Sequence, residues 1–201
     1  MPGYAVLDLE TTGFSWARGD RIVEIGIVAL GAGGEPEGEW TTLVNPQRMV
    51  GATRVHHITT SDVADAPTMG ELAPQLVEQL RGRIVVAHNC AFDVPFLVAE
   101  LTRAGVPLPG ERMPQLCTMR LSHYFLEPAS RRLEDCCRAA GIRLVDAHSA
   151  LGDARAAAQL LVHYMNSKVA CPPWQAELNR APSYRWPELS AGGAAHLLPR
   201  R

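Results

Sequence analysis

Four carboxylic acids and one histidine have residue types and spacings suited to divalent-metal chemistry. Asp8 and Glu10 lie two residues apart in an apolar run, so on a strand both side chains leave the same face. Asp93 and Asp153 follow much later, and His148 precedes Asp153 by five residues. Magnesium and manganese prefer oxygen ligands. Four carboxylates carry as many charges as two divalent ions, so the charge count is consistent with a site for two such ions.

Two ions about 3.5–4 Å apart can stabilise the attacking and the leaving oxygen of a phosphodiester. The attacking water must also lose a proton, and histidine suits that role because its ordinary pKa lies near neutral pH. Five residues along one helix would separate His148 from Asp153 around the axis. We therefore expect His148 in the loop before a helix and Asp153 in its first turn, where the helix dipole favours an acid. Gly152 leaves room there for backbone or substrate.

The sequence predicts that the elements carrying these residues form an α/β domain with a mixed sheet. The first three strands are expected to form an antiparallel meander. Asn89 is expected to cap the helix that carries Asp93. The expected strands are Tyr4–Glu10, Arg21–Leu30, Glu39–Val44 and Ile84–Ala87, and the expected helices are Thr68–Leu80, one from Asn89 to about Ala104, Arg131–Ala140 and one from near Leu151 to about Met165.

Length and composition indicate one domain over residues 1–167 and a C-terminal tail over 168–201. Prolines exclude long helices from the tail, and its aromatic residues predict that it docks partly on the body, with a frayed end. A net charge of −2 argues against a basic protein that coats nucleic acid. Five cysteines without zinc spacing suit reduced thiols in a cytoplasmic protein. We expect neither a signal peptide nor a membrane span.

Three segments resemble motifs of one enzyme family. Asp8-Leu9-Glu10-Thr11-Thr12-Gly13 looks like the first motif of the DnaQ-like 3′–5′ exonucleases, the DEDD superfamily. His88-Asn89-Cys90-Ala91-Phe92-Asp93 resembles the second motif, and His148 to Asp153 resembles the third, with the H-x-x-x-x-D spacing of the DEDDh variant. Val55-His56-His57-Ile58-Thr59 is similar to a segment between the first two motifs. The resemblance covers about residues 4–165.

This resemblance implies an RNase H-like fold, with a mixed five-stranded sheet flanked by helices. It implies two magnesium or manganese ions held by the four acids, with His148 as general base. The reaction would be hydrolysis from a 3′ end, which releases nucleoside 5′-monophosphates. The catalytic residues would be Asp8, Glu10, Asp93, His148 and Asp153.

Substrate contacts are implied less directly. In the family the residues after the first-motif glutamate contact the terminal nucleotide, which here maps to Thr11, Thr12 and Gly13. His57 is either a substrate contact or a structural histidine. Phe92 is either a substrate contact or a core residue.

Several functions are compatible with these residues. Single-stranded DNA is the favoured substrate, and RNA 3′ ends are the alternative because discrimination depends on what meets the 2′-hydroxyl. A proofreading subunit, similar to the epsilon subunit of DNA polymerase III, would have a similar catalytic domain and a polymerase partner, whereas a freestanding enzyme would serve repair. A non-catalytic module that binds nucleic-acid ends is the distant alternative.

Overall fold

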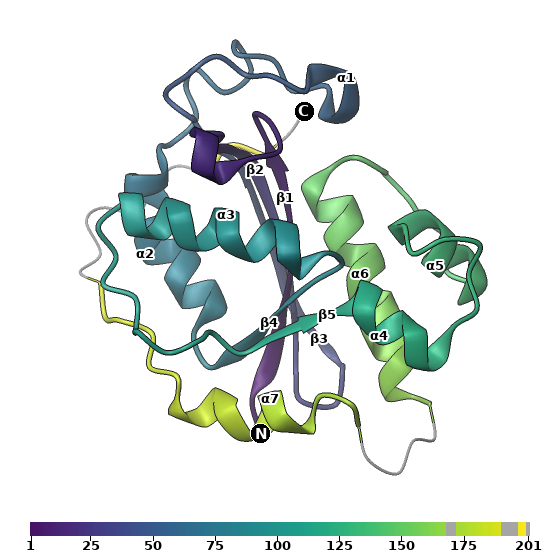
Figure 1. Ribbon diagram of the computed structural model, residues 1–201. Coiled ribbons are helices and arrows are strands. Elements are labelled where there is room, and N and C mark those ends of the chain that lie inside the picture. The colour runs from purple at the N-terminus through teal and green to yellow at the C-terminus, as the bar shows by residue number, and fades with distance from the viewer. Residues whose placement is uncertain (168–171, 190–196, 200–201) are drawn as a thin grey trace.

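The computed structural model describes residues 1–167, 172–189 and 197–199. Its centre is a five-stranded mixed sheet, as expected, and the strand order is β3-β2-β1-β4-β5 (Figure 1). β1 pairs antiparallel with β2 and parallel with β4, and β2 pairs antiparallel with β3. The strands are β1 Gly3–Thr11, β2 Ile22–Leu30, β3 Pro36–Leu43, β4 Arg83–Ala87 and β5 Gln115–Cys117.

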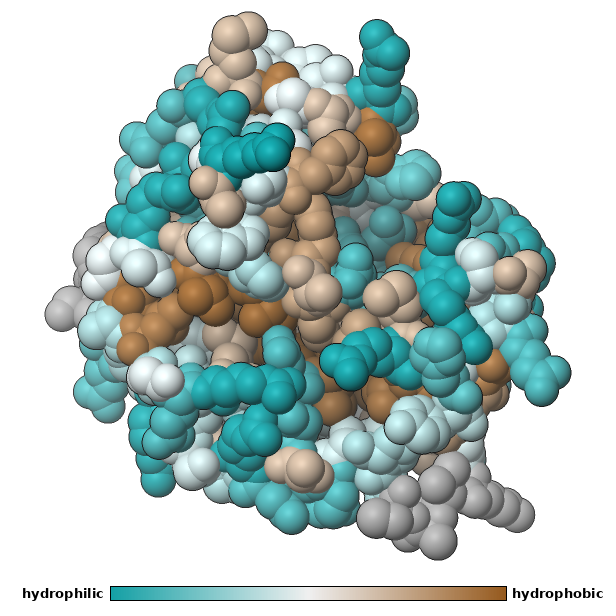
Figure 2. All heavy atoms as spheres, viewed as in Figure 1, coloured by the Kyte–Doolittle hydropathy of each residue, from teal (hydrophilic) through white to brown (hydrophobic). Residues whose placement is uncertain are grey.

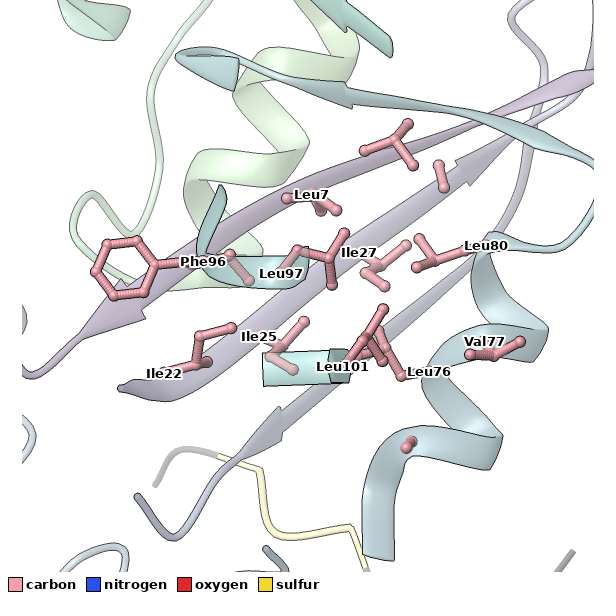
Figure 3. Close-up of a cluster of buried hydrophobic side chains, with 14 of the residues drawn as sticks. Leu7, Ile22, Ile25, Ile27, Leu76, Val77, Leu80, Phe96, Leu97 and Leu101 are labelled. Carbon is pink, nitrogen blue, oxygen red and sulfur yellow. The ribbon is translucent and has the colours of Figure 1, made fainter. Parts of the chain in front are cut away.

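Helices cover both faces of the sheet (Figure 1). The odd-numbered residues of β1 pack with α2 and α3, whereas its even-numbered residues pack with α4, α5 and α6. Figure 3 shows the first of these two cores, where Leu7 and Ile27 of the sheet meet Leu97 of α3. The helices are α1 Thr53–His56, α2 Met69–Leu80, α3 Cys90–Arg103, α4 Thr118–Phe125, α5 Leu133–Ala139, α6 Ala150–Met165 and α7 Gln175–Arg180.

β1 is the middle strand, so Asp8 and Glu10 are not solvated acids on a sheet edge. Both are even-numbered and extend the series that faces α6. Asp8 lies opposite Gly26 of β2, and Glu10 lies opposite Glu24. The alternation expected from the sequence therefore directs two carboxylates to the α6 side of the sheet.

Gly26 allows α6 to approach the sheet at this point. A Cβ atom at Gly26 would lie 2.3 Å from the backbone of Ala150 and Leu151, the first residues of α6. Backbone cannot move aside as the end of a flexible side chain can. The glycine therefore sets how closely the N-terminal turn of α6 lies to β1.

Substitution Gly26→Ala is expected to destabilise the protein by about 1–3 kcal/mol, as overpacking does. The melting temperature should fall by about 2–4 °C for each kcal/mol, which thermal unfolding would measure. Gly38→Ala on β3 is the matched control, because a Cβ atom there meets nothing within 4 Å. Equal melting temperatures for the two variants would contradict the assigned contact.

The expected elements form, with shifted ends, but two elements between α3 and α5 were not anticipated. They are β5, which has three residues, and α4, which follows it directly. The prediction that Asn89 lies at the cap of α3 is confirmed. Asn89 occupies the N-cap position but makes no side-chain capping bond; its carbonyl accepts from the amides of Phe92 and Asp93. α5 begins at Leu133, two residues later than expected.

Several aromatic residues after position 171 are buried against the body. Trp174, Tyr184 and Trp186 are 5%, 8% and 6% exposed, and the last two join the core beneath α2 and α3. The Arg81 side chain also donates to the carbonyls of Trp186 and Pro187. Among its described residues the tail has one short α-helix, α7, of six residues. Residues 168–171, 190–196 and 200–201 lie outside the described part of the chain, so the expected fraying falls largely on positions not described.

Within the described residues, no helix has the length and apolarity needed to span a bilayer.

Candidate active site

Three carboxylates meet where the end of β1 approaches the start of α6. Asp8, Glu10 and Asp153 each offer one oxygen, and these oxygens lie within 4.8 Å of one another. Asp8 and Glu10 come from β1, and Asp153 comes from the first turn of α6. The expected placement of Asp153 is thus confirmed, with the helix starting at Ala150 instead of Leu151. In the space-filling view this face is hollowed between α3 and α6 (Figure 2).

Three contacts hold the N-terminal turn of α6 in place. The Ser149 hydroxyl accepts a hydrogen bond from the Gly152 amide at 3.1 Å. The Ala150 amide donates to the buried Glu24 carboxylate at 3.0 Å. A Cβ atom at Gly152 would lie 2.3 Å from the Asp146 carbonyl, so the preceding loop packs directly on this glycine. The room expected beside Gly152 is therefore used by backbone.

Asp93 approaches the same region from α3. Its side chain is only 4% exposed and accepts a hydrogen bond from the Leu9 amide, between Asp8 and Glu10. Burial raises the pKa of Asp93 to about 8, although hydrogen bonds from backbone amides oppose that rise. Asp93 does not belong to the three-oxygen group, but its charge acts on Asp8.

The carboxylates disfavour one another's ionised forms when no cation is bound. Burial, then the charges of Asp93, Asp153, Glu10 and Glu24, raise the pKa of Asp8 well above its usual range. Burial also raises the pKa of Asp153, against the opposing effect of His148. One oxygen of Asp153, Oδ1, is buried without a hydrogen-bond partner among the described residues. A divalent cation fits this set, because it would supply the missing charge and the missing partner.

His148 lies in the loop before α6, as expected, two residues ahead of Ala150. Its backbone has φ of 65°, in the left-handed region, and its side chain is exposed. Both its charge and its backbone hydrogen bond lower the pKa of Asp153. The imidazole thus lies close enough to act electrostatically on the carboxylate cluster.

Comparison with known proteins matches the exonuclease family model RNase_T to residues 5–161. The chain belongs to this exonuclease family. A Mycobacterium tuberculosis protein named as a bifunctional exonuclease/endonuclease is 38% identical to this exonuclease domain over 168 residues, which are 79% of the chain and 26% of that protein. A DNA polymerase III of PolC type from Clostridium perfringens is 35% identical over 161 residues, which are 79% of the chain and 11% of that protein.

The fold of this exonuclease-family chain is similar to that of E. coli exonuclease I in complex with a dT13 oligonucleotide. The TM-score is 0.72 at 15% identity, over 83% of this chain and 41% of that chain. The RNase H-like architecture, a mixed sheet flanked by helices, is therefore confirmed. The chain spans about a quarter or less of the length of the two curated relatives. The family is metal-dependent, and the carboxylate cluster of this chain is a group that could hold a metal ion.

The turn after β1 is held by its own polar groups. The Thr12 hydroxyl donates to Asp20 at 3.1 Å and accepts from the Arg21 amide at 3.0 Å, while the Thr12 amide donates to the Arg21 carbonyl at 2.8 Å. The Thr11 hydroxyl donates to the Gly13 carbonyl at 2.6 Å. Both hydroxyls are thus engaged, and a Cβ atom at Gly13 would lie 2.4 Å from the Asp20 carboxylate, so a larger residue there would displace the side chain that accepts from Thr12.

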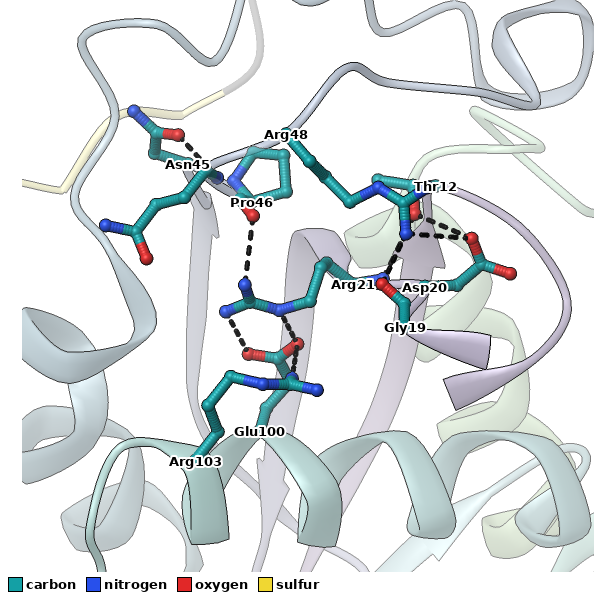
Figure 4. A network of polar contacts seen from close by, with 10 residues as sticks. Thr12, Gly19, Asp20, Arg21, Asn45, Pro46, Arg48, Glu100 and Arg103 are labelled. Atoms are coloured by element: carbon teal, nitrogen blue, oxygen red, sulfur yellow. Dashed lines mark hydrogen bonds and ion pairs between the residues drawn. The ribbon is translucent and has the colours of Figure 1, made fainter. Parts of the chain in front are cut away.

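A buried ion pair connects the start of β2 to α3, the helix that carries Asp93 (Figure 4). The Arg21 guanidinium donates two hydrogen bonds to Glu100, one through Nη2 at 2.9 Å, and a third to the Pro46 carbonyl at 3.0 Å. Arg103 also pairs with Glu100 at 3.0 Å. Since Arg21 also holds Thr12, this network fixes the first motif relative to α3. The sequence offered no local signal for it, because 79 residues separate Arg21 from Glu100.

Three further residues of the motifs lie outside the three-oxygen group. His57 is exposed after α1 and lines a separate cavity of about 510 Å³. Phe92 is half-buried and packs on the core between the sheet and α3, and its ring is tilted against that of Phe96 with ring centroids 5.0 Å apart. His88 is buried and hydrogen-bonds to Thr118 and to the Arg131 carbonyl, which is a structural role.

Glu24 is the residue at this site that sequence reasoning missed. It is 2% exposed, its carboxylate accepts from Ala150, and its charge raises the pKa of Asp8. A signal did exist, because Glu24 is an acid within an otherwise apolar strand segment, and an unpartnered buried acid is costly.

Two substitutions separate the hydrogen bond of Glu24 from its charge. Glu24→Ala leaves the Ala150 amide without its acceptor and is expected to destabilise the protein by about 1–3 kcal/mol. Glu24→Gln keeps an oxygen acceptor and removes a charge that opposes ionisation of Asp8, so it should be at least as stable as wild type without metal at neutral pH. Thermal unfolding in EDTA measures both. A glutamine variant as unstable as the alanine variant would show that the charge, not the acceptor, holds α6.

Proposed function

We propose that this domain is a DEDDh-type 3′–5′ exonuclease that releases nucleoside 5′-monophosphates. The observation that carries the proposal is the three-oxygen cluster of Asp8, Glu10 and Asp153, which includes a buried oxygen without a partner among the described residues. Membership of the exonuclease family supports the reaction class. The catalytic unit is assigned to residues 1–167, and described residues of the tail, such as Tyr184 and Trp186, pack against it.

Asp8, Glu10, Asp93 and Asp153 would hold two ions, magnesium or manganese. When bound, such ions stabilise the charge that develops on the attacking and leaving oxygens of a phosphodiester. Asp8 would gain from a bound cation, because burial and the charges of the neighbouring acids oppose its ionised form. Asp93 is held on its own helix and anchored by the Leu9 amide.

His148 is assigned the role of general base. Its loop precedes the helix that carries Asp153, and its exposed imidazole can exchange the proton of the attacking water with solvent. Left-handed backbone at His148 directs the loop around the first turn of α6. The side chain therefore depends on the same contacts of Glu24, Ser149 and Gly152 that position Asp153.

The terminal nucleotide is assigned to the turn after β1. Thr11, Thr12 and Gly13 would contact it, with the hydroxyls holding the turn in shape. Phe92, half-buried near the start of α3, would offer a ring edge to the substrate. His57 would contact a more distant part of the strand from the end of α1.

Single-stranded DNA is the proposed substrate. The names of the relatives support this choice, because PolC-type polymerase III is a DNA polymerase and the exonuclease I structure holds an oligo-dT strand. Proofreading with a polymerase partner, or repair as a freestanding enzyme, would both use this activity. An exoribonuclease is the second candidate, because the carboxylate cluster can act on either backbone.

The test uses 5′-labelled single strands of DNA and RNA with one sequence. Protein is added with magnesium, with manganese or with EDTA, beside an Asp8→Asn control. We expect a metal-dependent ladder that shortens from the 3′ end, faster for DNA than for RNA. A faster RNA ladder would make the protein an exoribonuclease. DNA and RNA strands that stay uncut with either metal, although the protein binds them, would contradict the proposed catalysis and favour a module that binds nucleic-acid ends.

A further inference from the structure

Two cysteines meet where α3 begins and β5 ends. Cys90 is the first residue of α3, and Cys117 is the last residue of β5. β4 and β5 run parallel, with Ala87 paired to Cys117. Cys90 follows Ala87 by three residues, so the strand pairing brings the two cysteines together although 27 positions separate them. The four described cysteines form no disulfide.

Each thiol is directed toward the segment that carries the other. The Cys90 thiol donates to the carbonyl of Leu116 at 2.8 Å, one residue before Cys117. The Cys117 thiol donates to the carbonyl of His88 at 3.2 Å, two residues before Cys90. The two side chains also hydrogen-bond to each other. The contact between the two thiols places their sulfur atoms close together, so a disulfide bond, with an S–S length of about 2.05 Å, is within reach of small side-chain movements.

The pair is accessible to a small molecule. Both cysteines line a cavity of about 860 Å³ between α3, α4 and α7. Cys117 is partly exposed, whereas Cys90 is 8% exposed. The adjacent pair Cys136 and Cys137 provides a contrast, because it is 0% and 1% exposed.

We propose that Cys90 and Cys117 are a modification site for hydroperoxides, at which they form a reversible intrachain disulfide. The Cys117 sulfur attacks the peroxide oxygen, the O–O bond breaks, and Cys117 becomes a sulfenic acid. The Cys90 sulfur then attacks the Cys117 sulfur, the S–O bond breaks, and water leaves with the Cys90 proton. The two thiols lose two electrons in total, and hydrogen peroxide is reduced to two waters.

The electrostatics assign the order of these steps. The hydrogen bond from Cys90 lowers the pKa of Cys117 to about 6, and the same bond, with burial, raises the pKa of Cys90. The thiolate is the nucleophilic form of cysteine. The more exposed sulfur is therefore also the one that reacts first, and the buried sulfur resolves the intermediate. The bond would tie the first turn of α3, which carries Asp93, to β5.

The test measures covalent structure and does not depend on nuclease activity. The starting protein carries Cys171→Ser, so that all four remaining cysteines have described surroundings. We expect dilute hydrogen peroxide to remove two hydrogen atoms per chain, as intact mass shows, and dithiothreitol to restore them. Peptide mapping without reductant should join the peptides of Cys90 and Cys117. A further Cys136→Ser substitution, as matched control, should change nothing.

Two variants test the order of the steps. Cys117→Ser should abolish the peroxide-dependent mass change. Cys90→Ser should leave a sulfenic acid on Cys117, which dimedone traps. Both serine variants retain a hydroxyl donor, and circular dichroism checks their fold. A protein that keeps all its thiols, a disulfide that maps to other cysteines, or a Cys90→Ser variant that dimedone does not label would overturn the proposal.

Discussion

Substitution Asp8→Asn is expected to abolish turnover and yet stabilise the metal-free protein. The asparagine side chain keeps the size of the aspartate but loses the negative charge that a divalent ion requires. Because the bound ions contribute several kcal/mol to the transition state, and each 1.36 kcal/mol is tenfold in rate, turnover should fall by about a thousandfold or more. The ladder assay with magnesium and with manganese measures this loss.

The stabilisation follows from the pKa of Asp8, which is raised well above its usual range by burial and by its acidic neighbours. Between the unfolded value of about 3.9 and the raised folded value, the folded chain keeps a proton that the unfolded chain has lost. Unfolding then releases protons, so stability falls as pH rises through this window. Asp93, whose pKa is raised to about 8, also keeps a proton in the folded chain, so it lowers the stability further as pH rises. Wild type in EDTA should therefore be less stable at pH 8 than at pH 5.

The Asp8→Asn variant would carry no such penalty at this position, so it should melt above wild type in EDTA at pH 8, by about 2–4 °C if the gain is 1 kcal/mol. The difference in melting temperature between the variant and wild type should be smaller at pH 5. Adding manganese should reverse the order, because only wild type gains the full binding energy. Asp65→Asn, at an exposed acid outside the cluster, is the control. A wild type with equal melting temperatures at both pH values in EDTA would refute the assigned electrostatics.

The features that the sequence predicted well depend on residues that are close together along the chain. Alternation along a strand placed Asp8 and Glu10 on one face, and helix geometry placed His148 before α6 and Asp153 inside it. These inferences need only the strand repeat and the helical turn. β5 was not predicted, because its three residues are too few to show the alternation of a strand. Its pairing with β4 also depends on the rest of the sheet.

The parts that the sequence did not predict depend on contacts between distant segments. Glu24 meets Ala150 across 126 positions, and only the folded sheet shows that Gly26 lies under the start of α6. Arg21 and Glu100 look like ordinary surface charges until the first motif and α3 are brought together. Carboxylates that cluster in the fold can thus be predicted from local motifs, whereas the residues that position them require the structure.

Substitution His148→Ala should separate catalysis from metal binding. A general base contributes about 10²–10⁴-fold to rate, so we expect a loss of turnover in that range. The carboxylate oxygens of the cluster are untouched, and the side chain is exposed, so manganese affinity and melting temperature should stay close to wild type. Turnover in the ladder assay and manganese titration by calorimetry measure the two properties on the same protein.

The pH profile distinguishes a base from a merely structural loop residue. Wild-type turnover should rise with pH, because only neutral imidazole accepts a proton. The His148→Ala profile should lack that rise, and added imidazole should restore part of the rate, since the exposed loop leaves room for it. His123→Ala, an exposed histidine on α4, is the matched control and should keep the wild-type profile. Near-native turnover of His148→Ala at neutral pH would mean that the water loses its proton to another group, and the remaining acids of the cluster would then have to supply it.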